Sequence, residues 1–109
     1  MSVFLVAMVR VDDPETYKQY TALTPDTIRA YGGRFVARGG TVDALEGPPF
    51  NQRMVILEFP TRERLDEWYN SPEYQEAKKL RVASAESQFL VINGVEDGYA
   101  PDAGVVKST

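Results

Sequence analysis

The side chains available for chemistry are restricted, because the 109-residue chain contains neither Cys nor His. Without a thiol there is no disulfide and no cysteine nucleophile. Without an imidazole the chain lacks the commonest general base near neutral pH and the commonest metal ligand. Composition therefore excludes Ser-His-Asp catalysis, His-ligated haem and zinc sites built from Cys or His. Any reaction must use Arg, Lys, Tyr, Asp, Glu, Ser, Thr or backbone groups.

Arg38 and Glu58 are the first candidates for catalysis. Arg38 occupies an even position of a predicted strand beside Gly39-Gly40, and its guanidinium could bind both oxygens of a carboxylate or an enolate. If this strand forms a hairpin with the next one, Glu58 falls roughly opposite Arg38, and the two would form a cross-strand ion pair. Glu58 could act as a general base if burial raised its pKa, whereas an arginine partner would keep it ionised. Pairing is favoured over ligand binding for Arg38, and both interpretations stay open.

Two tyrosines complete the catalytic candidates: Tyr20 near the start of one predicted helix and Tyr69 just before the start of another. A tyrosine hydroxyl can orient or protonate an oxyanion, although such residues more often bury the ring and leave the hydroxyl at a rim. Further substrate-binding candidates are Met8, Ser71 and Arg81. Ser71 is more typical of a helix cap than of a nucleophile, since no base is evident. Arg81 could reach the mouth of a pocket or pair with a neighbouring acid.

Four segments that must position these residues alternate between two faces, as strands do. They cover Val3 to Val11, Arg34 to about Val42, Arg53 to Phe59 and Ser87 to about Val95. One face is mainly apolar, and the other mixes apolar side chains with a few charged or polar ones. Gly39-Gly40 predicts a bulge or a bend in the second strand.

Helical signals separate the first strand from the second and the third from the fourth. Asp12-Asp13-Pro14-Glu15 begins the first helix with a carboxylate cap and an N-terminal proline, a spacing that suits capping better than metal binding. Pro25 predicts a kink, or a restart with Thr24 as a second cap. Thr61 begins a short helix, and Ser71-Pro72 begins the one that follows.

This order of elements, with right-handed crossovers, predicts an α+β fold: a ferredoxin-like βαββαβ sandwich. Its four-stranded antiparallel sheet has the order 4-1-3-2 and carries the helices on one face. The uncovered face has eight apolar members: Phe4, Val6, Met8, Val36, Met54, Ile56, Leu90 and Ile92. A patch of this size predicts a homodimer that packs sheet against sheet around a small cavity. Polar members of the same face would line or rim that cavity: Arg10, Arg34, Arg38, Glu58 and Gln88.

The bulk composition narrows the expected partners and location. Net charge is −4 with no basic block, so we expect no nucleic-acid partner. No apolar run approaches the ~20 residues that cross a bilayer, and the N-terminus lacks the features of a signal peptide. We therefore expect a cytoplasmic protein with no membrane partner. We place one domain at residues 1–96 and a tail at 97–109 that is mobile or lies on the dimer partner.

Several stretches together carry a family resemblance. They are Asp-Pro-Glu-Thr-Tyr-Lys-Gln-Tyr (13–20), Tyr-Gly-Gly-Arg-Phe-Val-Ala-Arg-Gly-Gly (31–40), Leu-Glu-Gly (45–47), Glu-Phe-Pro (58–60) and Trp-Tyr-Asn-Ser-Pro-Glu-Tyr (68–74). From about Val3 to Val95 the chain resembles the bacterial DUF1330 family, of the dimeric α/β-barrel superfamily. The resemblance implies a ferredoxin-like fold and barrel-forming dimers, and it implies no established reaction. Superfamily relatives include cofactor-free monooxygenases, lactone isomerases and haem enzymes, and those that bind haem through His are a poor model here.

Three functions are consistent with these observations. The first is a small cofactor-independent enzyme, monooxygenase-like or isomerase-like, acting on a small organic acid, lactone or phenol. In it Arg38 would hold an anionic group, and a tyrosine or Glu58 would move a proton. The second is a binding or sensing module that holds a small anionic or aromatic ligand without converting it. The third is a structural dimer in which the polar groups specify pairing.

Overall fold

The central strand of the sheet follows the alternation predicted from sequence. The computed structural model describes residues 2–95, and in them β1 (Val3–Val11) pairs with β3 (Arg53–Phe59) on one side and with β4 (Ala85–Asn93) on the other. With β2 (Arg34–Arg38) the antiparallel order is β2-β3-β1-β4, which confirms the predicted order 4-1-3-2. The predicted end of the domain at residue 96 and the tail 97–109 lie outside the described residues.

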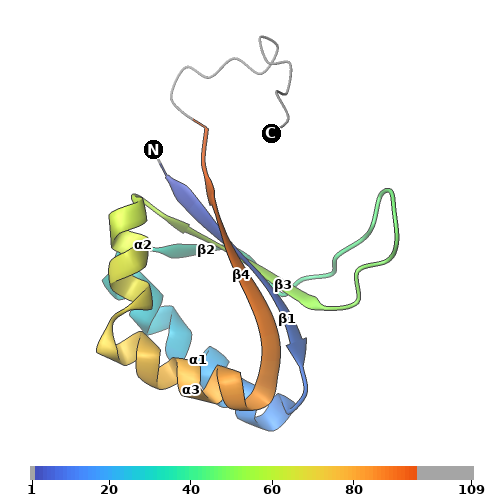
Figure 1. Cartoon of the computed structure of the whole chain (residues 1–109), viewed down its shortest axis with the longest axis horizontal. Helices are drawn as coiled ribbons and strands as arrows, with labels where there is room; N and C mark the ends of the chain where they lie inside the picture. Colours follow the sequence, from blue (N-terminus) through green and yellow to red (C-terminus); the bar gives the residue numbers. More distant parts are fainter. Residues whose placement is uncertain (1, 96–109) are drawn as a thin grey trace.

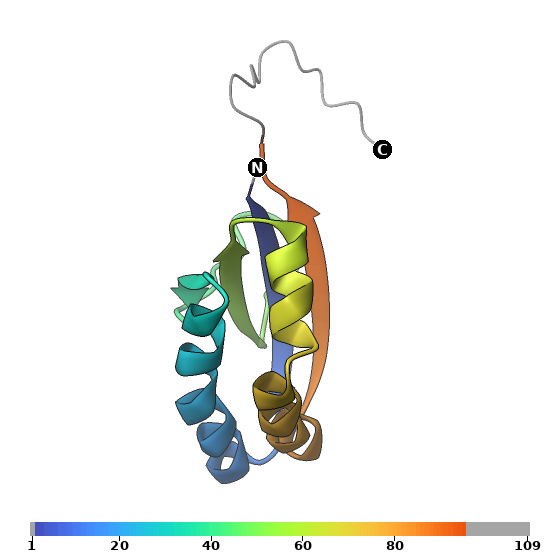
Figure 2. The ribbon, with the colours of Figure 1, turned by 90° about the vertical axis from the view of Figure 1, so that its left-hand side faces the viewer.

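The odd face of β1 forms the core. Val3, Leu5, Ala7 and Val9 are each no more than 4% exposed. Three helices cover this face of the sheet: α1 (Pro14–Ala30), α2 (Arg62–Tyr69) and α3 (Pro72–Ser84) (Figures 1 and 2). Burial of the odd positions confirms the two-faced pattern seen in the sequence.

The helices begin where their capping residues predict. The Asp13 carboxylate accepts hydrogen bonds from the backbone N–H of Thr16 at 3.3 Å and from its hydroxyl at 2.8 Å. Thr61 and Ser71 cap α2 and α3 in the same way, and such caps each contribute about 1 kcal/mol. Helix α1 runs through Pro25 as one element, so the expected restart at Thr24 was wrong.

Aromatic side chains join the helices to the sheet. Trp68 is 1% exposed, and its ring centroid lies 5.3 Å from that of Phe59 and 4.2 Å from that of Tyr74. The Trp68 Nε1–H also donates to the Thr27 hydroxyl on α1 at 3.1 Å. This buried indole therefore fixes α2 against α1 as well as against β3, and its polar atom is satisfied.

Strand β2 departs from the sequence prediction. Phe35 pairs with Leu57 but Ala37 pairs with Ile56, so Val36 is an extra residue in a bulge. After the bulge, Ala37 and Arg38 face the side of the sheet opposite to the one that strict alternation along β2 would assign to them. The bulge lies earlier than Gly39-Gly40, where the chain bends at Gly39 as one of the two predicted alternatives, and the strand ends at Arg38 instead of near Val42. Residues 39–52 then form a loop that projects away from the sheet (Figure 1).

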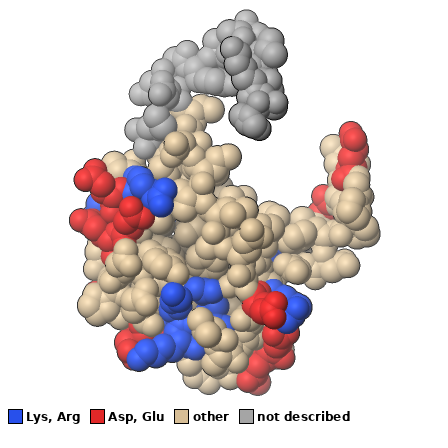
Figure 3. Space-filling model, in the orientation of Figure 1, with Lys and Arg blue, Asp and Glu red and all other residues tan. Residues whose placement is uncertain are grey.

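No helix or strand among residues 2–95 covers the other face of the sheet, since all three helices lie on one side of it (Figure 1). Leu90 and Ile92, which belong to this face, are 46% and 60% exposed. Charged side chains of both signs lie next to each other in patches on the molecular face drawn in Figure 3, with uncharged surface between them. Within the described range no helix is both long and apolar enough to span a bilayer.

Candidate functional site

A cavity lies between the sheet and the helices of a single chain. Its volume is about 40 Å³, and further space at its mouth is open to solvent. Core side chains such as Leu5, Val55 and Trp68 form most of its wall. Its polar lining consists of Tyr17, Tyr20, Thr21, Thr24, Arg38 and Arg53. This cavity is on the face opposite to the one where the sequence predicted a ligand space, and the predicted space between two sheets stays a prediction.

Arg38 lies on the helix side of the sheet, at the mouth of this cavity. The predicted cross-strand pair of Arg38 with Glu58 was wrong, because Arg38 is opposite Val55. Glu58 is opposite Arg34 instead, and the two form an ion pair with 2.6 Å between Arg34 Nη2 and Glu58 Oε1. The physical reason is the bulge at Val36, which shifts the register and turns Arg38 toward α1.

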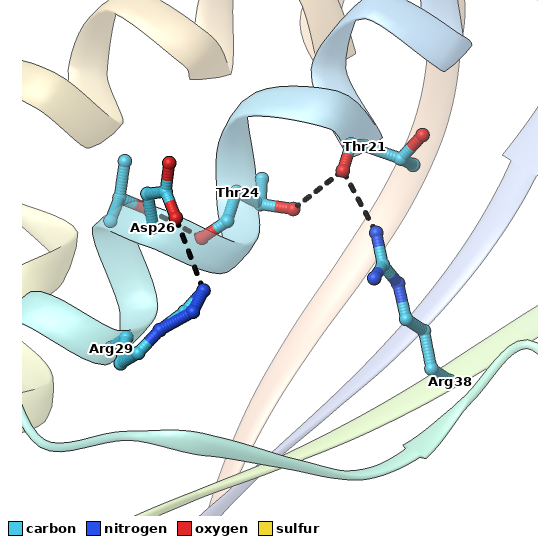
Figure 4. Close-up of polar contacts among 6 residues, drawn as sticks. Thr21, Thr24, Asp26, Arg29 and Arg38 are labelled. Carbon is cyan, nitrogen blue, oxygen red and sulfur yellow. Dashed lines mark hydrogen bonds and ion pairs between the residues drawn. The ribbon is translucent and has the colours of Figure 1, made fainter.

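Two contacts hold the Arg38 guanidinium in place. Its Nη2 donates to the backbone carbonyl of Thr21 at 2.8 Å, and its Cζ lies 4.4 Å from the centroid of the Phe35 ring. Figure 4 shows the side chain reaching from the end of β2 to this carbonyl on α1. Pro25 has no N–H, so the carbonyl of Thr21 has no backbone donor within the helix and can accept from Arg38.

Arg53 enters the cavity from the first residue of β3. Its Nε is buried and has no hydrogen-bond partner within residues 2–95. Its Cζ lies 5.8 Å from the centroid of the Tyr17 ring. The guanidinium also packs against Gly39, whose φ is +69°, and a Cβ at that position would collide with Nη1 of Arg53. Gly39 is therefore required by its backbone conformation, whereas the flexible end of the Arg53 side chain could shift to admit a Cβ.

Arg81 lies behind the wall of the cavity. This buried guanidinium donates from Nη1 to the Ser87 hydroxyl and from Nε to the Tyr74 hydroxyl at 3.3 Å. Its Cζ is 4.2 Å from the ring centroid of Phe89 and 6.0 Å from that of Tyr20, and both of these rings line the cavity. The hydroxyls of Tyr20 and Tyr74 are 2.8 Å apart, so a hydrogen-bonded chain runs from Tyr20 to Arg81.

The positive charge around this cavity is not neutralised. Across residues 2–95 no carboxylate forms an ion pair with Arg38, Arg53 or Arg81. All the other arginines have such a partner: Arg10, Arg29, Arg34, Arg62 and Arg64. Arg38 is exposed, Arg53 is half-buried and Arg81 is buried. An anion that enters the cavity would be attracted to these unpaired charges, most strongly where they are withdrawn from solvent.

The cavity tyrosines stay protonated at neutral pH. Burial raises the pKa of Tyr17, against the opposing effect of the charges on Arg53, Arg81 and Arg38. Burial also raises the pKa of Tyr20, and the neighbouring Tyr74 hydroxyl adds to this shift. Both hydroxyls can therefore donate a hydrogen bond to a bound anion, and neither is suited to remove a proton at neutral pH.

The remaining predicted site residues do not line this cavity. The Ser71 hydroxyl donates to the Trp68 carbonyl at 2.7 Å and accepts from the Tyr74 N–H at 3.1 Å, which confirms it as a helix cap. Tyr69 lines a separate cavity beside α2 that also includes Leu65. Met8 lies on the far face of the sheet, opposite Met54 and Gln88.

Glu58 also lies on that far face, and its environment favours the ionised form. A hydrogen bond from Ser2 is the largest cause of a lowered pKa for Glu58, and the Arg34 guanidinium adds to it. A general base requires a pKa raised toward neutrality, so this environment argues against that role.

Asp13 acts as a helix cap, and within residues 2–95 the acidic side chains form no group of three that could hold a metal ion.

Arg53 and Thr21 were not among the site residues predicted from the sequence. A signal for Arg53 exists in the sequence, because it occupies an odd position of a strand whose later odd positions, such as Val55 and Leu57, face the core. A charged side chain among the strand positions that face the core is unusual, because charged residues are rarely buried without a partner. Thr21 contributes its backbone carbonyl, which no pattern of side chains predicts.

Comparisons with known proteins agree with this fold. The family model described as a domain of unknown function (DUF1330) matches residues 2–95. RPA0582 from Rhodopseudomonas palustris, a protein of unknown function, has a similar structure with 23% identity and a TM-score of 0.73, covering 87% of this chain and 83% of its own. No curated protein matches the chain.

Two further solved structures share the architecture. SnoaB from Streptomyces nogalater, a cofactor-independent oxygenase, has 16% identity and a TM-score of 0.65, covering 87% of this chain and 94% of its own. A dimeric ferredoxin-like protein of unknown function from Jannaschia sp. CCS1 has 14% identity and a TM-score of 0.67, covering 86% of this chain and 100% of its own. At these identities the likeness establishes the ferredoxin-like fold.

Proposed function

This chain belongs to the DUF1330 family of domains of unknown function, and on that premise we propose that it binds a compact organic anion beside α1 and acts on it without a cofactor. The observation that carries the proposal is that Arg38 and Arg53 line one largely apolar cavity, with Arg81 behind its wall, and that none of the three has a carboxylate partner in residues 2–95. Unneutralised charges withdrawn from solvent, as at Arg53 and Arg81, are costly, and a bound anion would offset that cost.

The ligand is an organic acid or an ionised phenol. Arg38 and Arg53 enter from neighbouring strands, and both can donate to the oxygens of a carboxylate, phenolate or enolate. The apolar wall suits the carbon skeleton of such a molecule. The hydroxyls of Tyr17 and Tyr20 would complete the contacts to its oxygens.

The chemistry must start from a substrate that is already ionised. Among residues 2–95 no Asp or Glu lines the cavity, and the chain has no His, so the described lining offers no general base for neutral pH. A bound enolate or phenolate could isomerise, or it could supply electrons to O₂ as a co-reactant. The cofactor-independent oxygenase SnoaB has this fold. The reaction with O₂ is therefore compatible with the architecture, but the shared fold does not by itself assign that reaction to this chain.

A second candidate is a binding module that holds the anion without converting it. The observation that favours it is the same absence of a base among the residues that line the cavity. In either case we propose a homodimer, because the apolar far face of the sheet needs a cover. The structure from Jannaschia sp. CCS1 is described as dimeric, and it has the same fold.

Calorimetric titration with benzoate, succinate and pyruvate tests the binding site, with benzyl alcohol as an uncharged analogue of benzoate. We expect an anion to bind wild type, and Arg38→Gln and Arg53→Gln to weaken that binding. Arg29→Gln is the matched control, because Arg29 is exposed and paired with Asp26. Binding that is equal for benzoate and benzyl alcohol, or unaffected by both cavity variants, would contradict the site.

Two further measurements separate the remaining alternatives. Mass spectrometry after aerobic incubation with the anion that binds separates the functions, since an enzyme forms a product and a binding module returns the anion unchanged. Light scattering then tests the homodimer, and a stable monomer would remove it from the proposal.

A further inference from the structure

Pro25 lies inside α1 at the place where the helix touches the site. In a regular helix the N–H of residue 25 would donate to the carbonyl of residue 21, and proline has no N–H to donate. The helix continues on both sides of Pro25, from Pro14 to Ala30, so the carbonyl of Thr21 loses its helical donor while the helix stays intact. Thr21 lines the cavity, and its carbonyl is therefore available to a donor from outside the helix.

Arg38 supplies that donor. Its Nη2 is 2.8 Å from the Thr21 carbonyl oxygen (Figure 4), whereas the hydroxyl of Thr24, the other donor to this oxygen, is 3.4 Å away. Arg38 is an exposed side chain on the last residue of β2, and without such a contact it would sample many rotamers. A guanidinium has five N–H donors, so one hydrogen bond to Thr21 leaves the others for a ligand.

We infer that Pro25 is a positioning residue for the anion site. By leaving the Thr21 carbonyl without a helical partner, it fixes the Arg38 guanidinium at the mouth of the cavity. The inference rests on the proposed function for what the guanidinium then binds. Pro25 does not touch the ligand space, since the residues that line the cavity on this part of α1 are Thr21, Thr24 and Ile28.

Replacing Pro25 by alanine should keep or raise the melting temperature and, at the same time, weaken anion binding. Alanine at position 25 restores the helical hydrogen bond to Thr21 and is the better helix former. The melting temperature of Pro25→Ala should then be no lower than that of wild type. Arg38 would share its acceptor with the new N–H, and benzoate affinity should fall about fivefold, as for the weakening of one hydrogen bond.

The experiment compares Pro25→Ala with the matched control Pro14→Ala. Pro14 is in the first turn of α1, where a backbone N–H has no carbonyl acceptor within the helix. Replacing Pro14 by alanine therefore leaves the hydrogen bonds of the helical carbonyls unchanged. Benzoate, succinate and pyruvate affinities are measured by calorimetry in wild type, both proline variants, Arg38→Gln and the double variant Pro25→Ala/Arg38→Gln. Rotation of the Arg38 guanidinium is measured by NMR of its Nε–H group.

We expect faster guanidinium rotation and weaker anion binding in Pro25→Ala alone, with no further loss when Pro25→Ala is added to Arg38→Gln. Unchanged rotation of the Arg38 guanidinium in Pro25→Ala would overturn the inference. So would a loss of affinity that is equally large in the Arg38→Gln background. If no anion binds wild type, the proposed function fails, and the Arg38 rotation then decides by itself whether Pro25 positions this side chain.

Discussion

Replacing Arg53 by methionine is expected to stabilise the protein while it weakens anion binding. Methionine keeps an unbranched apolar stem along the same path and removes the buried Nε that lacks a partner among residues 2–95. It also removes one of the charges that gather at the cavity. A residue that served only the stability of the fold would show the opposite sign of stability change, so this variant separates a structural role from a ligand-binding role.

The expected size follows from the contacts of Arg53. A buried donor without a partner costs about 1–3 kcal/mol, which the substitution would recover. The contact of its guanidinium with the Tyr17 ring, 5.8 Å from the centroid, is lost. That loss costs about 0.5–1 kcal/mol. We therefore expect the free energy of unfolding to rise by up to about 2.5 kcal/mol. Loss of a charge-assisted hydrogen bond should weaken benzoate binding by about tenfold to a hundredfold.

Urea denaturation and calorimetry with benzoate measure the two effects on the same samples. Arg34→Met is the control, because Arg34 is an exposed arginine on the neighbouring strand β2, paired with Glu58 on the far face. It should lose no more than about 1 kcal/mol of stability and bind benzoate as wild type does. The reasoning is refuted if Arg53→Met is destabilised more than Arg34→Met, or if it binds benzoate as tightly as wild type.

Three other substitutions test the supporting structure. Gly39→Ala should lower the free energy of unfolding by at least about 1–2 kcal/mol, because φ is positive there; Gly40→Ala, with open space around it, is the urea-denaturation control. Tyr74→Phe leaves the Tyr20 hydroxyl without its partner and should cost about 1–3 kcal/mol by the same measurement; an unchanged midpoint would contradict that contact. The folded-state pKa of Glu58 is below its ordinary value of 4.5, so its ionised form stabilises the protein above that pH, and this contribution is lost as pH falls. On acidification, the free energy of unfolding of Glu58→Gln should therefore fall less than that of wild type. Equal falls in the two proteins would show that the Glu58 carboxylate does not contribute to the pH dependence of stability.

Most of the fold could be predicted because burial acts on every second residue of a strand. The predicted bounds of β1 and β3, Val3–Val11 and Arg53–Phe59, match the structure. The capping residues located the starts of all three helices. β4 was predicted from Ser87 to Val95 and runs from Ala85 to Asn93, since strand pairing with β1 and not composition decides where a strand ends.

The candidate site could be predicted only in part, because it depends on one extra residue in β2. Strict alternation assigned Arg38 to the far face with Glu58, and the bulge at Val36 reverses that assignment. Nothing in the residue type of Val36 signals a bulge, since valine is a common residue of regular strands. The interaction that holds Arg38 depends on a backbone carbonyl that Pro25 leaves free, so side-chain patterns selected Arg38 but could not identify the acceptor that holds it.

The central claim is that Arg38, Arg53 and Arg81 form one site for an organic anion, and NMR of the arginine Nε–H groups during a benzoate titration tests it most directly. We predict that the signals of these three arginines shift together and saturate with one dissociation constant, while those of the ion-paired Arg10 and Arg34 do not move. Signals that do not shift at millimolar benzoate, or shifts of equal size at Arg10 and Arg34, would contradict the account.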